Sequence, residues 1–473
     1  MKTIIMLALL MPLICFSQKT KSDLWKEMDK QAEQFNSIAL KIWNFAELGY
    51  REEQSAALLA ETLEQAGFKI ARGVVELPTA FTAEFGSGKP VIGILGEYDA
   101  LPGLSQEATG ERKPIPGKKA GHGCGHHLFG TASAAAAISV KNWMAANKIK
   151  GTIRFYGTPA EENGSGKVYM VQAGLFNDAD VVFHWHPGSK NTAKPRSSLA
   201  NRTGLFRFYG IASHAAGSPE KGRSALDAVE AMNFMTNLMR EHVEEDSRIH
   251  YVITKGGEAP NVVPAFAEVY YYIRHPKRTE LNAMWERLIN NAKGAALGTD
   301  TRMEYEFGGV YEILVNKPLA MAMHENLKAV GGFELTADEK EFGRKIQTTL
   351  SNPPPLESTA SIEDFNSSSE EKYGSTDVGD VSWVVPTAGL RTATWVPGTS
   401  AHSWQAVAAG GMSIGMKGMG AAAKVLAGVM VDAFTKPALI AAAKKEFEAN
   451  RGSNFTYKSM LGDQKPPVLN PRD

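Results

Sequence analysis

Cysteine is scarce in this chain, and neither sign of charge is in excess. The sequence of 473 residues has two cysteines and 51 basic against 51 acidic side chains. A net charge of zero, without a run of Lys or Arg, argues against a nucleic-acid-binding protein, because sequence-independent binding to phosphates needs clustered positive charge. With 43% hydrophobic and 22% charged residues, the composition excludes a disordered or collagen-like chain. We therefore expect a globular protein with a small-molecule or protein partner.

The N-terminal region lacks an apolar run long enough to span a membrane. Residues Ile4–Phe16 form an apolar run of about 13 residues, which fits the core of a signal peptide and falls short of the roughly 20 residues of a membrane span. We predict a signal peptide at residues 1–17, cleaved near the Ser17/Gln18 bond, and an exported protein, periplasmic or extracellular, with no membrane span. A retained anchor and a lipidated Cys15 are the alternatives.

Cleavage at this bond would leave a single cysteine. Cys15 is removed with the signal peptide, and only Cys124 stays in the mature chain. One cysteine cannot form an intramolecular disulfide, which is the usual role of cysteine in an exported protein. Cys124 therefore calls for another explanation.

Hydrophobic periodicity predicts an α/β fold for most of the chain. Apolar residues at three- and four-residue steps predict helices, and short β-type runs between them predict strands. Strands that alternate with helices favour a sheet covered on both sides, whose ligands collect at the carboxyl ends of the strands. The predicted helices cover 22–45, 52–66, 128–146, 317–329 and 411–433, and the predicted strands 81–85, 91–95, 152–156 and 180–184.

The pattern changes between residues 203 and 312. It runs strand, helix, two strands, helix and strand, which is the ferredoxin-like α+β order. We predict a separate domain at 203–312, inserted between the two parts of the first domain, 18–202 and 313–473. The tail after Asn450 carries three prolines and is expected to lie extended over the surface. The elements of the inserted domain are expected at 205–211, 224–241, 249–254, 267–274, 280–293 and 302–307.

Seven of the eleven histidines fall in four tight clusters, and one cluster also holds the cysteine. Cys124 and His126 lie two residues apart on a glycine-rich turn, where both side chains can reach one ion. Thiolate and imidazole are ligands of zinc and its neighbours, whereas calcium and magnesium prefer oxygen ligands. The cluster therefore predicts a transition-metal site.

Two adjacent carboxylates, Glu161 and Glu162, directly follow the strand predicted at 152–156. Neighbouring side chains at a strand end point in different directions, so one can bind a metal while the other takes a proton from the attacking water. This division of roles suits metal-assisted hydrolysis. The plain alternative is a pair of solvated glutamates at the start of a helix.

Further candidates lie at two other strand ends. In His184-Trp185-His186, alternation puts both imidazoles on one face, and spacing alone does not decide which of them is a ligand. The carboxylates of Glu97-Tyr98-Asp99 follow the strand at 91–95 and are expected to orient a metal-binding histidine.

Six separated motifs now stand in order along the chain. Together they resemble the zinc-dependent aminoacylase/carboxypeptidase metallopeptidases, and within them the amidohydrolase branch, over roughly residues 30–435. The segments Gly374–Trp383 and Gly398–Trp404 are particularly close to one subgroup of that branch. The six motifs are Gly96–Pro102, Gly121–His127, Gly157–Glu162, Ser213–Ala215, Gly257–Pro264 and His402.

The resemblance implies a di-metal exopeptidase-like catalytic domain with a mixed sheet covered by helices, and an inserted ferredoxin-like lid domain through which a homodimer forms. It implies two divalent ions per chain, zinc with manganese or cobalt as alternatives, and Glu161 as general base. Glu97 stands where the carboxypeptidase branch has a histidine, which leaves the filling of the second metal position open. The implied ligands are Cys124, His126, Glu162, His184 (preferred over His186 by counting within the motif) and His402.

Three more residues receive roles from the resemblance. His214 corresponds to a histidine that is lent across the dimer to the scissile carbonyl, and Asn261 and Arg274 to residues that hold the carboxylate or carbonyl of the substrate. The implied activity is hydrolysis of an amide next to a free carboxylate, in an N-acyl or N-aroyl amino acid of the p-aminobenzoyl-glutamate kind or in a dipeptide. A catalytically idle binding protein for such conjugates and a structural metal protein are the competing hypotheses.

Overall fold

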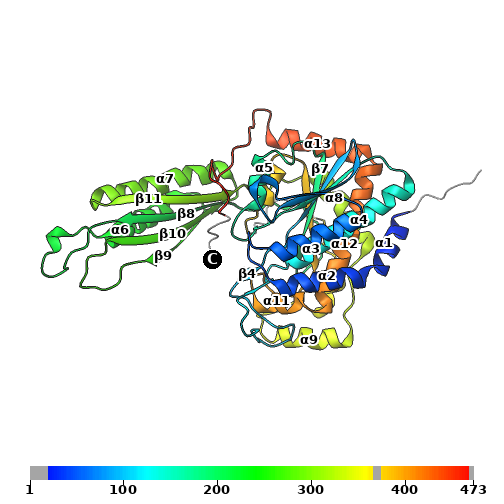
Figure 1. Cartoon of the computed structure of the whole chain (residues 1–473), viewed down its shortest axis with the longest axis horizontal. Coiled ribbons are helices and arrows are strands. Elements are labelled where there is room, and N and C mark those ends of the chain that lie inside the picture. Colours follow the sequence, from blue (N-terminus) through cyan, green and yellow to red (C-terminus); the bar gives the residue numbers. More distant parts are fainter. Residues whose placement is uncertain (1–19, 366–373, 468–473) are drawn as a thin grey trace, which may run out of the picture.

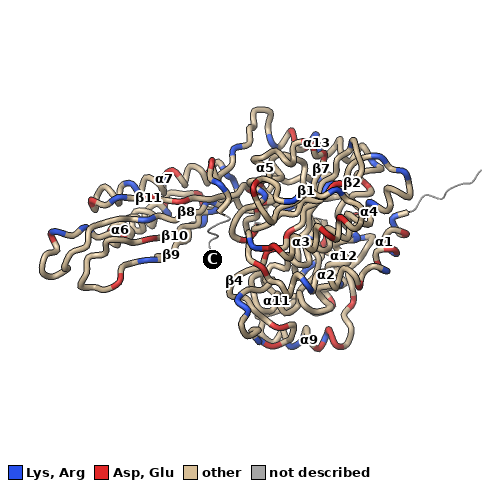
Figure 2. Tube along the Cα trace, in the orientation of Figure 1, with Lys and Arg blue, Asp and Glu red and all other residues tan. Residues whose placement is uncertain are grey.

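The computed structural model describes residues 20–365 and 374–467. The predicted signal peptide and the Ser17/Gln18 bond therefore lie outside the described residues. The described chain forms two bodies, a larger one built on a helix-covered sheet and a smaller one that projects from it (Figure 1). Both signs of charge are scattered over the two bodies, as the sequence composition leads one to expect (Figure 2).

A mixed six-stranded sheet forms the centre of the larger body. The strand order is β1-β2-β6-β3-β7-β12, in which β6, β3, β7 and β12 run parallel and β1 and β2 are antiparallel at one edge. All six residues of β3 are buried, as expected for a strand covered on both faces. The predicted α/β fold is confirmed. The strands are β1 Lys69–Arg72, β2 Phe81–Ser87, β3 Val91–Gly96, β6 Gly151–Gly157, β7 Val181–Gly188 and β12 Thr387–Ala393, and a separate pair is formed by β4 Leu101–Pro102 and β5 Ala120–Gly121.

Two long helices pack against each other beside this sheet. α4, His126–Asn147, is Ala-rich and buried along most of its length, and it packs against α12, Ser413–Thr435. In the part of the chain that the structure describes, α12 alone is long and apolar enough to cross a membrane, but 78% of its apolar window is buried in the protein, as in a core helix. The other α-helices are α1 Lys21–Lys30, α2 Ala32–Phe45, α3 Glu53–Gln65, α5 Gly166–Gln172, α8 Lys317–Val330, α9 Ala337–Gln347, α10 Val378–Ser382, α11 Trp404–Gly410 and α13 Pro437–Arg451.

The smaller body has the predicted succession of strand, helix, two strands, helix and strand. Its antiparallel sheet has the order β11-β8-β10-β9, with α6 and α7 packed on one face. Buried and half-buried residues alternate along β10 because one face of the sheet is covered and the other is open. The elements are β8 Ala200–Tyr209, α6 Ala225–Met239, β9 Arg248–Lys255, β10 Phe266–His275, α7 Arg278–Gly298 and β11 Arg302–Val310.

The segment after α13 differs in part from the prediction. Most of its described residues are exposed or half-buried and belong to no helix or strand, as predicted, but it does not lie on the surface throughout, because Met460 and Leu461 are only 2% and 5% exposed. Met460 belongs to the hydrophobic core of the smaller body, and Leu461 packs between residues of α5 and β11. In the larger body, the hydroxyl of Tyr457 donates a hydrogen bond of 2.7 Å to the buried carboxylate of Asp380. The C-terminal segment therefore joins the two bodies.

Candidate metal centre and active site

The predicted motifs meet in a cavity of about 1090 Å³ between the two bodies. Its inner wall includes Cys124, Glu161 and His186 from the larger body, and its outer wall includes Tyr270 and Arg274 from β10 of the smaller body. Glu161 follows the parallel strand β6 and His186 lies near the end of β7, where ligands collect in α/β sheets, and Cys124 lies just before α4.

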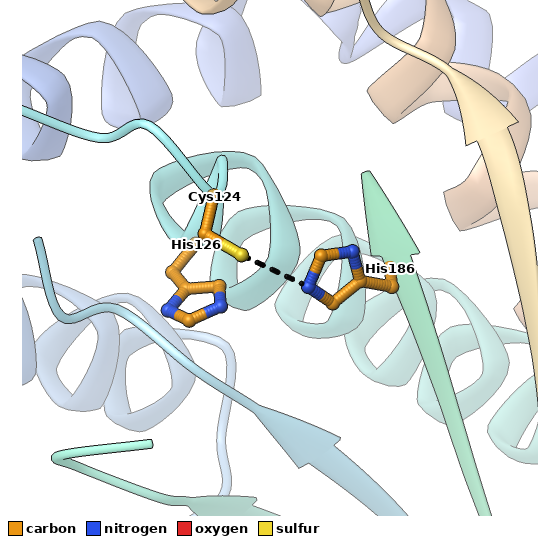
Figure 3. A group of neighbouring side chains, drawn as sticks. All are labelled: Cys124, His126 and His186. Carbon is orange, nitrogen blue, oxygen red and sulfur yellow. Dashed lines mark hydrogen bonds between the residues drawn. The ribbon is translucent and has the colours of Figure 1, made fainter. Parts of the chain in front are cut away.

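A glycine turn brings the cysteine and its neighbouring histidine to this wall. Gly125 has a φ of 81° and lies directly before α4, and a Cβ at this position would be 2.7 Å from Cβ of Pro187. Only glycine tolerates both the left-handed conformation and this close approach. Cys124 and His126 stand on either side of it, and Sγ of Cys124 is 3.3 Å from Nε2 of His186 on β7 (Figure 3).

The structure therefore brings His186 to the cysteine, where the motif count preferred His184. Both imidazoles lie on the same face of β7, as alternation predicts, but the strand continues to Gly188 and only its later histidine reaches the glycine turn. The ring of His184 lies over Gly389 of β12, where a Cβ would come within 2.3 Å of it. In the described part of the chain, His184 belongs to no group of potential metal ligands. The geometry therefore favours His186 over His184 as the candidate ligand.

A strained backbone turn presents the two adjacent carboxylates. Ala160 is fully buried and has a φ of 56°, a left-handed conformation that is uncommon for a residue with a side chain. Its backbone N–H donates to Oε1 of Glu52 at 2.7 Å, and Glu52 also accepts a hydrogen bond of 3.0 Å from Thr79. Burial, together with the nearby carboxylate of Asp99, raises the pKa of Glu52 to about 8. Glu52 thus holds the turn from which Glu161 and Glu162 extend.

Asp99 connects this turn to the histidine of α4. Its Oδ1 is 2.7 Å from Nδ1 of His126, and its Oδ2 accepts the backbone N–H of Glu162 at 2.9 Å. A proton on Nδ1 that points to a carboxylate leaves Nε2 as the free electron-pair donor. This is the orienting contact that the strand-end position of Asp99 leads one to expect.

The side chains that converge here form two overlapping groups, Cys124 with His126 and His186, and Cys124 with Glu162 and His402. Within each group the potential ligand atoms lie within 4.8 Å of one another. Nε2 of His402 is 3.3 Å from Oε2 of Glu162. A third group, Glu97, His126 and Glu161, adjoins the first two.

Several buried atoms of these groups make no hydrogen bond, although two of them, Nε2 of His126 and Oε2 of Glu97, lie 3.1 Å apart as a possible ion pair. Among the described residues, Oε2 of Glu97, Nε2 of His126 and Oε1 of Glu162 make no hydrogen bond. Burying such atoms without a partner is costly. Because the orphaned atoms lie in one cluster beside a thiol and imidazoles, the residues fit a divalent cation of the zinc type.

The electrostatics of the cluster support the same conclusion. Burial and the carboxylate of Glu162 raise the pKa of the Cys124 thiol. Burial and the carboxylates of Glu97 and Glu162 raise the pKa of Glu161. Acidic groups packed this closely resist ionisation, and a bound cation reverses that tendency.

Lys167, which the sequence analysis did not single out, balances part of this negative charge. Its fully buried Nζ lies 2.8 Å from Oε1 of Glu97 and 2.7 Å from Oδ1 of Asp377. One oxygen of Glu97 thus binds the lysine, while the other lies 3.1 Å from Nε2 of His126. A lone lysine in an apolar helix gives no sequence signal for such a role.

The other predicted site residues occupy two different places. His402, which has a φ of 57°, donates its backbone N–H to the carbonyl of Gly123 at 2.9 Å, so its loop is attached to the cysteine turn. Arg274 lines the cavity, but His214 and Asn261 do not. These two lie together beyond the opposite end of the smaller sheet, where the N–H of Ala215 donates to the carbonyl of Asn261.

The two remaining histidines of the glycine-rich motif are structural. Nε2 of His122 is 3.0 Å from the carbonyl oxygen of Ile42, and Nε2 of His127 is 3.0 Å from that of Gly410. Both rings are buried, and burial lowers the pKa of each. They anchor the start of α4 to α2 and to the end of α11.

Comparison with known proteins identifies the family. A model of peptidase family M20/M25/M40 matches residues 93–358, more than half of the chain. The chain belongs to this family. This M20 peptidase is 42% identical to one of the subunits of the p-aminobenzoyl-glutamate hydrolase of Escherichia coli, over 89% of the chain and 93% of that protein. It is 31% identical to Xaa-Arg dipeptidase of Mus musculus, over 89% of the chain and 91% of that protein.

A solved structure agrees with the fold. The YXEP protein of Bacillus subtilis, described as a dinuclear metal-binding peptidase of the M20 family, superimposes with a TM-score of 0.59 at 17% identity, over 86% of this chain and 99% of that one. The resemblance drawn from the six motifs is confirmed. The M20 peptidase is a hydrolase of amide bonds, and an amidohydrolase like its two relatives.

Glu52→Gln should change how the stability of the metal-free protein depends on pH. The folded-state pKa of Glu52, about 8, lies above its ordinary value of 4.5. The contribution of this carboxyl group to the unfolding free energy of wild type therefore falls as the pH rises from about 5 to about 8. Glutamine does not ionise, and its Oε1 can still accept the Ala160 N–H. The unfolding free energy of the variant relative to wild type should therefore rise over this range, by up to a few kcal/mol at about 1.4 kcal/mol per pKa unit.

Urea unfolding at pH 5 and pH 8, in the presence of a chelator, measures this difference. Glu53→Gln, at the exposed neighbouring position on α3, is the matched control and should show no such trend. A difference between Glu52→Gln and wild type that stays constant with pH would contradict the role given to Glu52.

Proposed function

We propose that this M20 peptidase is an exported, metal-dependent amidohydrolase that cleaves the amide next to a free carboxylate in N-acyl or N-aroyl amino acids, of the p-aminobenzoyl-glutamate kind, or in dipeptides. The observation that carries the proposal is the placement of Glu161 beside the two overlapping ligand groups in the cavity. Export rests on the apolar run at residues 4–16 alone.

Two divalent ions are proposed for the cluster, with zinc favoured and manganese or cobalt as alternatives. Cys124, His126 and His186 would hold one, and Cys124, Glu162 and His402 would hold the other. When bound, such ions supply Lewis acidity, which polarises a carbonyl and makes a water molecule more acidic.

Glu161 is the proposed general base. It makes no ion pair with Lys167 and no hydrogen bond to a backbone donor among the described contacts, and burial with neighbouring carboxylates raises its pKa, which favours a carboxylate that accepts a proton. In this role Glu161 takes a proton from the attacking water and returns it to the leaving amine nitrogen. An idle binding protein, the competing hypothesis, would have no need of this carboxylate.

Arg274 is proposed to bind the free carboxylate of the substrate. It lies at the end of β10 that faces the cavity, and its Nε is buried without a hydrogen-bond partner among the described residues. A guanidinium can pair with a carboxylate through two parallel hydrogen bonds. The carboxylate would thereby fix the scissile amide relative to Glu161.

His214 and Asn261 are proposed to act in the site of a second copy of the chain. In their own chain they lie beyond the end of the smaller sheet that is far from the cavity. The smaller body offers a surface for assembly, because β9 is an edge strand whose Val252 and Ile253 are exposed, and Phe234 of α6 is exposed as well. We propose a homodimer through this surface. The Escherichia coli relative is named as one of two different subunits of its hydrolase, which makes a different partner chain the alternative.

Glu161→Gln should abolish most hydrolysis while the metal stays bound. Loss of a general base lowers kcat by roughly 100- to 10,000-fold. The assay uses p-aminobenzoyl-glutamate, a panel of N-acyl amino acids and dipeptides, and zinc, manganese or cobalt, with metal content measured on the same samples. A fully active variant would refute the mechanism, and a wild type that is inert on the whole panel would refute the activity.

Cys124→Ser and His186→Asn should each lower metal affinity by more than 100-fold. Replacing a residue that only supports a ligand typically lowers metal affinity by roughly 10- to 100-fold, and His184→Asn should have at most this effect. Removing a ligand takes away a bond to the ion, whereas His184 lies over Gly389. Metal per chain is measured by mass spectrometry after dialysis against a weak chelator. Normal metal content in Cys124→Ser would count against the whole site, and loss in His184→Asn alone would restore the original ligand choice.

Mixing two inactive variants tests the shared site. His214→Ala keeps Glu161 but lacks the lent imidazole, and Glu161→Gln keeps the imidazole. After dissociation and reassociation, dimers with one chain of each variant contain one site with both groups. If pairing is random, about half of the dimers are of this mixed kind, so activity should recover to about a quarter of the wild-type value. Mixtures that stay as inactive as their components would show that His214 does not act across a dimer.

A further inference from the structure

The C-terminal segment, residues 452–467, contacts the two bodies in alternation. Met460 packs in the core of the smaller body. Leu461 packs with Val168 of α5 in the larger body and with Val310 of β11 in the smaller one. Both Met460 and Leu461 are almost fully buried. The segment is thus packed between α5 and β11.

Hydrogen bonds continue the alternation. The side-chain amide of Gln172 on α5 donates to the carbonyl oxygen of Gly462 at 2.9 Å. The side-chain amide of Gln464 donates to the carbonyl oxygen of Phe307 on β11, also at 2.9 Å. Phe307 lies three residues, or roughly 10 Å, before β11 ends at Val310. The segment is therefore attached to the smaller body along β11 and not only at the end of this strand.

Two adjacent glycines of β11 leave room for the segment. A Cβ at Gly309 would lie 2.9 Å from Cβ of Met460, which is closer than two such atoms can come. A Cβ at Gly308 would touch Leu461, at 3.8 Å from its Cδ2. Glycine inside a strand weakens it and often marks a place where another part of the chain approaches closely. The sequence of β11 therefore fits close attachment of the C-terminal segment.

The covalent connections between the two bodies form a narrow neck. The chain passes between them at 189–199 and at 311–316. These two stretches lie side by side, because the hydroxyl of Ser197 donates to the carbonyl oxygen of Ile313 at 2.7 Å and the N–H of Ile313 donates to the hydroxyl of Ser198 at 3.0 Å. Domains joined in this way move relative to each other unless an apolar interface holds them. The C-terminal segment adds apolar contacts beyond the neck.

The proposed catalytic arrangement needs both bodies. Glu161 belongs to the larger body and Arg274 to the smaller one, and both line the cavity. Val310, Asn201 and Arg274 are register partners on β11, β8 and β10, which places Val310 roughly 10 Å from Arg274 across two strand spacings. On the other side, α5 follows the turn that carries Glu161. The C-terminal segment therefore joins the sheet of the arginine to the helix behind the general base.

We propose that Met460 and Leu461 are positioning residues, which act through the C-terminal segment to fix the separation of Arg274 from Glu161. Their role rests on the proposed function, in which the substrate carboxylate binds Arg274 while the scissile amide lies beside Glu161. A displacement of about 1 Å that begins far from the reacting atoms can lower the rate roughly 100-fold. The segment thus matters most for substrates that reach across the cavity to both bodies.

Two substrates distinguish this role from a general effect on stability. p-Aminobenzoyl-glutamate carries a carboxylate next to the scissile amide, and p-aminobenzoyl-4-aminobutyrate is the same molecule without it. Wild type should have a kcat/KM roughly 10- to 100-fold higher for the glutamate conjugate, the value of hydrogen bonds to a charged group. Met460→Ala and Leu461→Ala should each lower this ratio by roughly 3-fold or more, because Arg274 no longer stands at the distance that the substrate spans.

Arg274→Gln links the ratio to the arginine. This variant alone should lower the ratio to about 1, and adding Met460→Ala to it should leave the ratio unchanged, as expected for two residues that act through one contact. The ratio of two substrates is insensitive to a general loss of folded enzyme.

Met284→Ala is the matched control, because Met284 is a buried methionine of α7 in the same hydrophobic core and does not line the cavity. Met460→Leu conserves the apolar volume. Both variants should keep the wild-type ratio. Gln464 is exposed, so Gln464→Ala removes the hydrogen bond to Phe307 without leaving a cavity. It should lower the ratio even if the alanine variants of Met460 and Leu461 fail to fold.

The outcomes separate the positioning role from the function on which it rests. A wild-type ratio in Met460→Ala, Leu461→Ala and Gln464→Ala, or an equal fall in Met284→Ala, would overturn the positioning role while amide hydrolysis stands. A further fall when Met460→Ala is added to Arg274→Gln would overturn it too. A wild type that hydrolyses both conjugates equally would overturn the role of Arg274 and with it that of the segment. A wild type inert on both would overturn the proposed function as well.

Discussion

The carboxylate of Asp99 holds together the two segments that carry most of the metal-binding side chains. One oxygen fixes the imidazole of His126 at the start of α4, and the other accepts the backbone N–H of Glu162 in the turn after β6. Because both contacts come from one side chain at the end of β3, the histidine and the glutamate cannot shift independently. The central sheet sets the spacing of the centre through this link.

Charge balance is the second constraint on the site. Glu97, Glu161, Glu162 and Asp377 crowd one region, and the buried lysine Lys167 offsets only part of their charge. The remaining acids surround the cluster, and basic side chains line another wall. The crowded carboxylates favour a cation at the inner end of the cavity.

Much of the fold could be predicted from the sequence because periodicity reports on local burial. The predicted strands at 81–85, 91–95 and 152–156 correspond to β2, β3 and β6, and the helix at 128–146 lies within α4. The single helix expected at 22–45 is in fact two, α1 and α2, separated at Gln31, a break that the apolar stripe does not reveal. β12 and α9 were missed.

The candidate site was predictable where a motif is compact and unpredictable where contacts are long-range. Cys124, His126 and the two adjacent glutamates lie in short motifs with a chemical meaning. The choice between His184 and His186 depended on where β7 ends, and Lys167 matters only because folding brings it to Glu97 and Asp377. The loop at 351–373 falls partly outside the described residues, so its expected contribution to the pocket stays a prediction.

The position of β12 at the edge of the central sheet has a consequence for biosynthesis. β7 ends at Gly188, but the strand that pairs with it begins at Thr387, after the helices and strands of the smaller body have been made. The helices and strands of the smaller body are continuous in sequence from β8 to β11 and precede β12, although its core is completed only by Met460, and β7 keeps an open edge until β12 arrives in the last fifth of the chain. An unpaired edge is a point where nascent chains associate wrongly. For this protein, the interval between β7 and β12 is the stretch of synthesis in which a chaperone would be most needed.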